Sequence, residues 1–340
     1  LMTNFTPIAM TMGEPAGIGG EITLKAWANT EGGPLPPFFT IDDPARLQKI
    51  ARDLQWPIEV IPIEDPATTA DVFRLGLPVL PLKLPAQVKS GEPNPANAKS
   101  VVAAIDMAVK LVTKGSASAI VTNPIHKNIL YENGFGHPGH TEYLAELAGE
   151  NRSAMMLACP GLRTVPVTTH VSLSNAIRTL TAKNIIEISN ITISSLKQDF
   201  GIQVPQIAIA ALNPHGGEQG RLGVEENEII QPAIDELKRQ GANVAGPAPA
   251  DTLFHAQARE NYDAVICMYH DQALIPLKTI DFVGGVNITM GLPFVRTSPD
   301  HGTAFEISGL GIADETSLVS AVRMAADIAN RRLKKRQITE

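Results

Sequence analysis

The sequence predicts an α/β fold with two domains, each with helices packed on a mostly parallel sheet. Short apolar runs of strand character alternate with helical patterns along almost the whole chain, which is typical of parallel strands joined by helices. The chain has 340 residues, more than one hydrophobic core usually serves, so two domains are expected. Hydrophobic residues make up 44% and charged residues 19%, the balance of a compact protein rather than a disordered one.

The first 125 residues show this alternation in regular order. A glycine-rich turn, GEPAGIGGE, follows the first strand, but its spacing matches neither the dinucleotide-binding fingerprint nor the P-loop. The stretch 77–97 is rich in proline and is expected to run over the surface. The expected strands are PIAMTM, FFTID, IEVIPI and SASAIVTNP, and the expected helices are ITLKAWAN, ARLQKIARDL and the amphipathic NAKSVVAAIDMAVKLVTKG.

The composition argues against several classes of protein. A net charge of −7 without a patch rich in lysine and arginine argues against a nucleic-acid-binding protein. No apolar run approaches the roughly 18 residues that span a membrane, and the N-terminal residues lack the pattern of a signal peptide. Cys159 and Cys267 lie in apolar runs without C-x-x-C spacing, so we expect them to be reduced core residues. The expected location is therefore the cytoplasm.

Three apolar runs each end on a histidine. RTVPVTTH ends on His170, QIAIAALNPH ends on His215, and AVICMYHD ends on His270 followed by Asp271. Ligands of open α/β sheets bind beyond the carboxyl ends of the strands, so these imidazoles are expected at the functional edge. Three neutral imidazoles can hold a divalent metal and leave one position open. The alternative is that each histidine is an ordinary loop or core residue.

The stretch GFGHPGHTEYLAELAGE predicts a second site. A turn rich in glycine and proline leads to His140 and Thr141, and Thr141 is the expected N-cap of the helix EYLAELA. The free N–H groups at a helix N-terminus bind phosphate or carboxylate. The alternative is that Thr141 only caps the helix.

The stretch LKTIDFVGGVNITMGLPFVRTSPDHGTAFEI predicts a ligand loop, because it is broken by glycines and too polar for a core. Its two cations and its amide suit a carboxylate and a phosphate, and arginine can bind such groups with two hydrogen bonds. The alternative is a set of unrelated surface residues. The polar residues in question are Lys278, Asn287, Arg296, Asp300 and His301.

Taken together, these stretches resemble the 4-hydroxythreonine-4-phosphate dehydrogenase family of vitamin B6 biosynthesis. They occur in the family's order from about residue 8 to residue 310. The segment HGTAFEISGLGIAD is also similar to the nucleotide loop of isopropylmalate dehydrogenases, whose fold the family shares. The matching pieces are TMGEPAGIGGEI, IVTNPIHK, GHPGHTEYLAELAG, TTH, LNPHGGEQG, GPAPADTLF, MYHDQALIPLK and GVNITMGLPFVRTSPDHGTAFEISGLG.

The resemblance implies an isopropylmalate dehydrogenase-like fold, with two α/β/α domains around a central cleft. We expect a discontinuous nucleotide-side domain at 1–125 plus 290–340. A domain for metal, substrate and dimerisation is expected at 126–289. The resemblance also implies a homodimer with the active site at the subunit interface and metal ligands shared between the partners.

The resemblance also implies roles for single residues. Glu14 stands where the family commonly has Asp, and Gly217 follows Gly216 where Ala-Gly is common. His126 matches no metal position. The implied metal is zinc, with magnesium and cobalt as alternatives, and the implied cofactor is NAD, with NADP as the alternative. The implied metal ligands are His170, His215 and His270, the substrate contacts are His140, Thr141, Lys278, Asn287 and Arg296, the candidate bases are Asp251 and Asp271, and the cofactor contacts are Gly291, Asp300 and His301.

The implied reaction is the NAD-dependent oxidation of 4-phosphooxy-L-threonine at C3. The resulting 2-amino-3-oxo-4-phosphooxybutanoate loses carbon dioxide to give 3-amino-2-oxopropyl phosphate. One alternative is a paralogous dehydrogenase of phosphorylated threonate or erythronate. Two further alternatives are a zinc hydrolase, which would leave the HGTAF segment without a purpose, and a non-catalytic protein that binds a metal or a phosphorylated metabolite.

Overall fold

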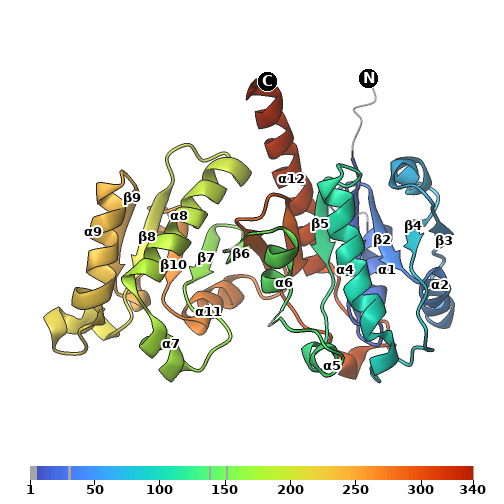
Figure 1. The fold of residues 1–340 in the computed structure, drawn as a ribbon, viewed down its shortest axis with the longest axis horizontal. Coiled ribbons are helices and arrows are strands. Elements are labelled where there is room, and N and C mark those ends of the chain that lie inside the picture. Colours follow the sequence, from blue (N-terminus) through green and yellow to red (C-terminus); the bar gives the residue numbers. More distant parts are fainter. Residues whose placement is uncertain (1–5, 30–31, 138, 151, 340) are drawn as a thin grey trace. The chain divides into compact units, whose positions relative to one another are not determined.

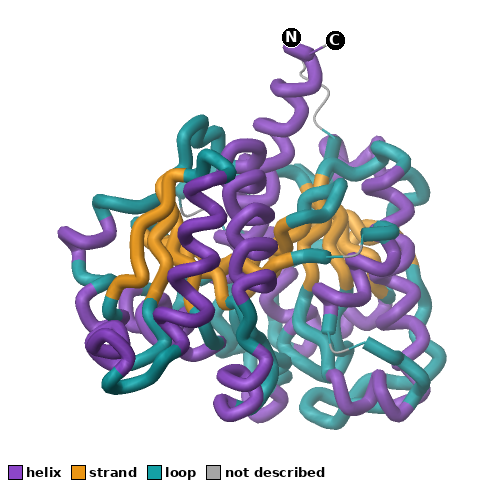
Figure 2. The backbone as a smooth tube through the Cα atoms, turned by 60° about the vertical axis from the view of Figure 1, so that its left-hand side comes forward, coloured by secondary structure: helices purple, strands orange, loops and turns teal. Residues whose placement is uncertain are grey.

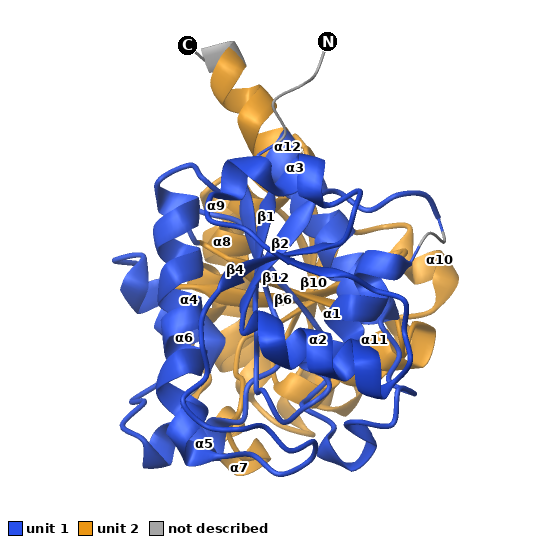
Figure 3. Cartoon of the chain, turned by 90° about the vertical axis from the view of Figure 1, so that its right-hand side faces the viewer, with its two compact units in different colours: residues 1–151, 292–330 blue, residues 152–291, 331–340 orange. Residues whose placement is uncertain are grey.

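The structure, a computed structural model, describes residues 6–29, 32–137, 139–150 and 152–339 (Figure 1). The chain divides into two compact units, coloured separately in Figure 3. Unit 1 contains residues 1–151 and 292–330, and unit 2 contains residues 152–291 and 331–340. Strands and helices alternate in both units, which confirms the predicted α/β class. The functional domains expected at 1–125 plus 290–340 and at 126–289 stay a prediction.

Unit 1 is built on parallel strands in the order β3-β4-β2-β1-β5-β12. In the middle of this sheet Ile8 of β1 lies opposite Phe38 of β2 on one side and opposite Ala119 of β5 on the other. Figure 2 draws the strands in orange, with the purple helices beside them. The strands are β1 (Ile8–Thr11), β2 (Phe38–Asp42), β3 (Val60–Pro62), β4 (Leu77–Pro81), β5 (Ala119–Thr122) and β12 (Arg296–Pro299).

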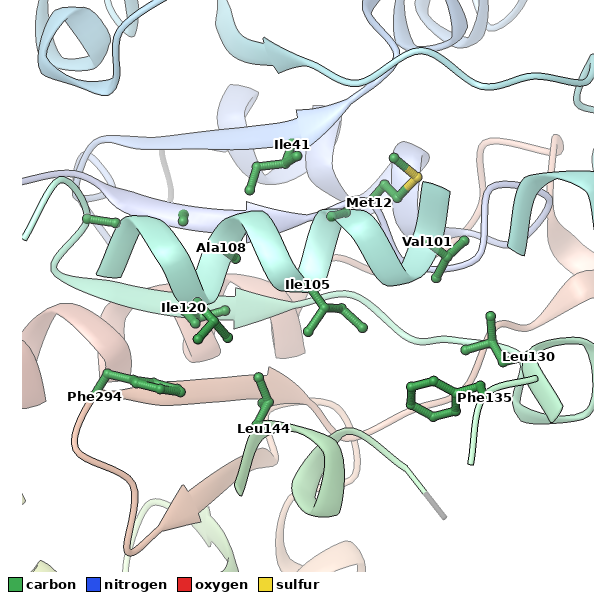
Figure 4. Packing of buried hydrophobic residues seen from close by; sticks show 14 of the residues in the cluster. Met12, Ile41, Val101, Ile105, Ala108, Ile120, Leu130, Phe135, Leu144 and Phe294 are labelled. Carbon is green, nitrogen blue, oxygen red and sulfur yellow. The ribbon is translucent and has the colours of Figure 1, made fainter. Parts of the chain in front are cut away.

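Helix α4 covers one face of this sheet, as its amphipathic pattern predicts. Its buried residues Val101, Ile105 and Ala108 recur at helical spacing. They pack with Ile41 of β2 and Ile120 of β5 in one hydrophobic cluster (Figure 4). The helical segments of unit 1 are α1 (Gly19–Ala28), α2 (Pro44–Asp53), η1 (Pro66–Thr68), α3 (Thr69–Val72), η2 (Pro95–Asn97), α4 (Ala98–Thr113), α5 (Lys127–Glu132), α6 (His140–Leu147), η6 (Phe305–Ile307) and α12 (Thr316–Thr339), which unit 1 holds as far as residue 330.

The prediction that 77–97 runs over the surface is wrong for its first part. Residues 77–81 form β4, which lies between β3 and β2. Leu77 and Val79 are fully buried. Pro78 and Pro81 lower the strand propensity of this segment, but apolar packing in the middle of a sheet outweighs that preference.

Unit 2 is built on strands in the order β11-β6-β7-β10-β8-β9. Strands β7, β10, β8 and β9 pair in parallel, whereas β6 runs antiparallel to both β7 and β11. The sheet is therefore mostly parallel on the side that carries the three histidine-ended runs. The strands are β6 (Ala154–Cys159), β7 (Leu162–Pro166), β8 (Gln206–Ala210), β9 (Asn243–Ala248), β10 (Ala264–Cys267) and β11 (Val286–Met290).

Helix α11 packs directly on the unit 2 sheet. Its buried Ala273 and Leu277 belong to one cluster with Val265 and Cys267 of β10. No helix in the described ranges is long and apolar enough to cross a membrane. The helical segments of unit 2 are α7 (Leu173–Thr179), α8 (Ala182–Asp199), η3 (Pro214–Gly220), η4 (Glu226–Ile230), α9 (Gln231–Arg239), η5 (Ala250–Thr252), α10 (Ala256–Arg259) and α11 (His270–Ile280).

Candidate functional site

Three histidines follow three neighbouring strands of the unit 2 sheet. His170 comes shortly after β7, His270 shortly after β10 and His215 shortly after β8. These strands pair in parallel in the order β7-β10-β8, so their carboxyl ends lie at one edge of the sheet. Such an edge is where open α/β sheets bind ligands.

The rings of His170 and His270 lie close together. Their centroids are 5.7 Å apart, with 44° between the ring planes. Two imidazoles that bind one zinc ion tetrahedrally have centroids about 5 Å apart. Nδ1 of His270 lies 2.7 Å from Oδ1 of Asp271, and this contact leaves Nε2 of His270 as the nitrogen for a metal. Within the described part of the chain, however, no three His, Cys, Asp or Glu side chains are close enough together to hold an ion.

Two of these histidines have strained backbones. His170 and His215 both have φ of 53°, in the left-handed region that non-glycine residues seldom adopt. In the turn after β8, all residues from 215 to 219 have positive φ. Strain of this kind persists where the surrounding structure fixes it, and it is concentrated at functional sites.

A buried carboxylate, Glu226, fixes the turn that carries His215. Its Oε1 accepts hydrogen bonds from the N–H groups of Leu212 and Asn213 at 2.8 and 2.7 Å. Its Oε2 accepts one from the side-chain amide of Asn213 at 2.9 Å. Glu226 could not be recognised from the sequence, because an acidic residue in a helical pattern usually lies on the solvent-exposed face.

Replacing Gly217 with alanine is expected to deform the His215 turn. A Cβ at Gly217 would lie 2.6 Å from Oε2 of Glu226, and φ there is +74°. We expect Gly217→Ala to lower the free energy of unfolding by about 1–3 kcal/mol and to reduce activity. Gly216→Ala is the matched control, because φ is +63° there but the nearest atom lies 4.0 Å from the added Cβ. Equal losses in chemical denaturation and in turnover for both variants would contradict a role for the Glu226 contact.

A buried amide, Gln272, connects the ends of β10 and β8. Its Oε1 accepts from the N–H of Met268 at 2.7 Å, and its Nε2 donates to the carbonyl of Ala211 at 2.7 Å. The hydroxyl of Thr168, close to His170, donates to the carbonyl of Met268 at 2.8 Å. These bonds fix the three histidine-bearing segments relative to one another. The sequence carried no signal for Gln272, because its partners are distant in the chain.

Two expected substrate contacts lie in unit 2. Lys278 lies in the last turn of α11, with Nζ 5.2 Å from the ring centroid of Phe282. Asn287 lies in β11, and its Oδ1 is buried without a hydrogen-bond partner among the described residues. Because buried polar atoms are nearly always paired, this atom is a candidate for a ligand contact.

The remaining candidates of unit 2 differ in their surroundings. Asp271 contacts His270, whereas Asp251 is exposed in η5, near the turn of His215. Gly291 has φ of +86°, and a Cβ there would lie 3.1 Å from the carbonyl oxygen of Arg152. Of the two candidate bases, only Asp271 makes a hydrogen bond to a candidate metal ligand in the described structure.

Unit 1 holds a buried arginine, Arg296, at the start of β12. Arg296 is 3% exposed, and its guanidinium donates to Oγ1 of Thr122, at the end of β5, from Nε at 3.1 Å and from Nη2 at 2.6 Å. The charge of Arg296 also reaches His140, the first residue of α6. Nε2 of His140 is buried without a hydrogen-bond partner among the described residues.

The electrostatics of this group favour an anion. Burial, together with the charges of Arg296 and Lys127, holds the pKa of His140 well below its usual range, so this imidazole is neutral at pH 7. Burial lowers the pKa of Arg296 to about 10, and the carboxylate of Glu142 opposes that shift. At pH 7 the guanidinium remains charged. Unit 1 therefore offers a buried cation and, within range of its charge, a neutral imidazole, and both can donate to a phosphate or carboxylate.

Two details of unit 1 differ from the sequence predictions. The N-cap of α6 is Gly139, and Thr141 lies inside the helix without capping it. Gly139 has an extended backbone, and the helix begins at His140. Asp300 and His301 follow β12, where the N–H of Asp300 donates to Oγ of Ser317 at 3.0 Å and Nδ1 of His301 lies 3.0 Å from the carbonyl of Gly302.

The prediction of one polar ligand loop from Lys278 to His301 is wrong. Lys278 is in a helix, Asn287 is in β11, and Arg296 is in β12, where it is buried. Lys278 and Asn287 belong to unit 2, and Arg296 belongs to unit 1. Glycines and polar residues made this stretch look irregular, but they end two short strands rather than interrupting a loop.

Comparisons with known proteins agree over almost the whole chain. The family model described as "Pyridoxal phosphate biosynthetic protein PdxA" matches residues 35–325. A 4-hydroxythreonine-4-phosphate dehydrogenase of Roseobacter denitrificans is 49% identical over 96% of this chain and 98% of its own length. An enzyme of the same name from Caulobacter vibrioides is 48% identical, with the same coverage.

Solved structures lead to the same family. A crystal structure of 4-hydroxythreonine-4-phosphate dehydrogenase from Klebsiella pneumoniae superposes with a TM-score of 0.84 and 38% identity, over 95% of this chain and 99% of that one. A terephthalate 1,2-cis-dihydrodiol dehydrogenase from Burkholderia xenovorans has a TM-score of 0.62 and 25% identity, over 95% and 98% of the two chains. Both neighbours are dehydrogenases, and they confirm the predicted fold class.

Proposed function

The chain belongs to the PdxA family of pyridoxal phosphate biosynthetic proteins, and from this premise we propose that it oxidises 4-phosphooxy-L-threonine at the C3 hydroxyl with NAD. The resulting β-keto acid, 2-amino-3-oxo-4-phosphooxybutanoate, loses carbon dioxide to give 3-amino-2-oxopropyl phosphate. The observation that carries this proposal is the 49% identity to a 4-hydroxythreonine-4-phosphate dehydrogenase over nearly the full length of both chains.

His170, His215 and His270 are the residues that would hold a divalent metal, with zinc as our assignment. Their imidazoles are suitable donors, they follow adjacent parallel strands, and two of the rings are 5.7 Å apart. When bound, such an ion supplies a Lewis acid for the negative charge that develops on the substrate oxygen. We propose that the site belongs to a homodimer, with metal ligands shared between the partners.

The other polar residues bind and orient the substrate. Arg296 presents a buried cation and His140 a neutral ring nitrogen to one anionic group, with Thr141 beside them on α6. Lys278 supplies the second cation, and Asn287 supplies a buried amide oxygen that can accept from a hydroxyl or an amine. Fixing phosphate and carboxylate in this way aligns C3 for hydride transfer.

We assign different roles to the two aspartates. Asp271 orients His270 through the contact to Nδ1, which fixes the tautomer of the ring. Asp251 is exposed beside the His215 turn and takes the proton of the C3 hydroxyl.

The cofactor is assigned to the HGTAF segment, with Gly291, Asp300 and His301 as its expected contacts. The carboxylate of Glu21, in the first turn of α1, accepts a hydrogen bond from the N–H of Gly309 and another from that of Gly311, the latter at 3.0 Å. These bonds hold the SGLG residues that follow HGTAF in place. Bound nicotinamide nucleotide would supply the hydride acceptor. A cytoplasmic location is part of the proposal, supported by the two free cysteines.

A side-by-side assay tests the substrate assignment. We expect the purified protein to reduce NAD with 4-phosphooxy-L-threonine and to show a much lower kcat/KM with 4-phospho-threonate, which lacks the amino group. A preference for the threonate would contradict the assignment and favour the paralogous dehydrogenase.

A further inference from the structure

Three segments of unit 1 converge around Glu14. The N–H of Glu14, in GEPAGIGGE, donates to the carbonyl of Pro124 in TNPIHK at 2.8 Å. The N–H of Ile18 donates to the carbonyl of Thr303 in HGTAF at 3.0 Å. The ring of His126 stands edge-on to Phe305, with centroids 5.1 Å apart. Two loops after neighbouring strands, β1 and β5, therefore meet the segment assigned to the cofactor.

Glu14 and His126 have polar atoms that the described residues do not use. Glu14 is 4% exposed, and among the described residues its carboxylate accepts one hydrogen bond, from the N–H of Ala16 to Oε1 at 3.0 Å. Nδ1 of His126 is buried and has no hydrogen-bond partner among the described residues. A buried carboxylate and a buried imidazole nitrogen both need partners, and a bound ligand can provide them.

The position of the pair indicates which part of the ligand it meets. On one side is the HGTAF segment, through Phe305. On the other side the chain continues from His126 directly into Lys127. The charge of Lys127 lowers the pKa of His140, which is assigned with Arg296 to a substrate anion. The pair thus lies between the residues assigned to the cofactor and those assigned to a substrate anion, where the reactive end of the cofactor has to lie.

We propose that Glu14 and His126 bind the nicotinamide end of the cofactor, with the Glu14 carboxylate facing the ring and His126 holding its carboxamide. This inference rests on the proposed function. The oxidised nicotinamide ring carries a positive charge and the reduced ring is neutral, so a nearby carboxylate stabilises the oxidised form selectively. The imidazole of His126 can form a hydrogen bond with the carboxamide, which is present in both forms.

Binding of NAD+ and NADH to the metal-loaded protein, measured by calorimetry without substrate, tests the charge effect. We expect Glu14→Gln to raise the Kd of NAD+ about tenfold and that of NADH less than about twofold. Glu14→Asp keeps the charge and is expected to keep the wild-type ratio of the two affinities. Glu64→Gln removes an exposed carboxylate elsewhere in unit 1 and is the matched control. An equal loss for both nucleotides in Glu14→Gln, or no loss, overturns the proposal.

Variants of His126 test the hydrogen bond. We expect His126→Phe to weaken both nucleotides about tenfold, and His126→Asn, whose amide can still bond the carboxamide, to weaken them less. Equal binding by His126→Phe and wild type would overturn this half of the proposal.

The wild-type protein offers a test that needs no variant. Burial raises the pKa of Glu14, while the hydrogen bond from the N–H of Ala16 and the nearby His126 and Arg46 oppose that shift. The affinity for NAD+ is therefore expected to rise with pH as the carboxyl group loses its proton, and to rise more than the affinity for NADH. A ratio of the NAD+ and NADH affinities that does not change with pH contradicts the inference.

These measurements also separate the inference from the proposed function. If the wild type binds neither nucleotide, the proposed function itself fails. Normal turnover of Glu14→Gln with an unchanged ratio of the two affinities removes this inference alone.

Discussion

Replacing His215 with alanine is expected to lower kcat/KM at least about a thousandfold, because Lewis-acid stabilisation of the developing charge is worth several kcal/mol. His215 is exposed in its turn, and the turn is held by Glu226 through bonds that do not involve the imidazole. The variant should therefore fold normally. We expect wild-type thermal unfolding, loss of tightly bound metal and loss of NADH formation.

The control for this experiment is another exposed histidine of unit 2. Nδ1 of His255 accepts a hydrogen bond from the N–H of Ala258 at 3.3 Å and caps α10. His255→Ala is expected to cost about 1 kcal/mol of stability and to keep full activity and metal content. Wild-type turnover in His215→Ala, or metal loss in both variants, would contradict the assignment of His215.

Replacing Arg296 with methionine is expected to give the second-largest loss, about a hundredfold to a thousandfold in kcat/KM, since two charge-assisted hydrogen bonds to an anion contribute about 1.5–3 kcal/mol each. Arg296 is 3% exposed, and its guanidinium donates two hydrogen bonds to the hydroxyl of Thr122. A buried guanidinium can bind an anionic group with two parallel hydrogen bonds, which suits it to the substrate's phosphate or carboxylate. Steady-state kinetics with 4-phosphooxy-L-threonine measure the loss.

Two further variants separate charge from geometry. Arg296→Lys keeps the cation but loses the planar fork, so an intermediate loss is expected. Arg163→Met removes a half-buried arginine of unit 2 that stacks on Phe200 at 4.6 Å and donates to the carbonyl of Asp263. It should reduce stability without changing KM. An unchanged kcat/KM in Arg296→Met would rule out substrate binding by this residue.

The sequence predicted the elements whose pattern is local. The apolar spacing of Val101, Ile105 and Ala108 is enough to predict α4 and the face that it buries. The apolar runs that end at His170, His215 and His270 predicted the strands β7, β8 and β10. They also predicted that the three histidines follow the carboxyl ends of these strands. Strand β4 was not predicted, because its prolines lower the strand propensity of the segment whereas its core packing favours a strand.

The contacts that shape the candidate site could not be predicted from the sequence. Thr122 and Arg296 are far apart in the chain, and only the pairing of β5 with β12 brings them together. The bonds from Glu226 to the His215 turn and from Gln272 to Ala211 depend equally on tertiary structure. No sequence motif marks residues of this kind, because the fold, and not their spacing in the sequence, determines which residues they contact.

The most direct test of the account is NADH formation from 4-phosphooxy-L-threonine by the purified protein, measured before chelation, after chelation and after zinc is restored. We expect turnover that disappears on chelation and returns with the metal. Turnover that is indifferent to chelation would contradict the three-histidine metal site. No turnover from a folded, zinc-loaded protein would contradict the proposed reaction itself.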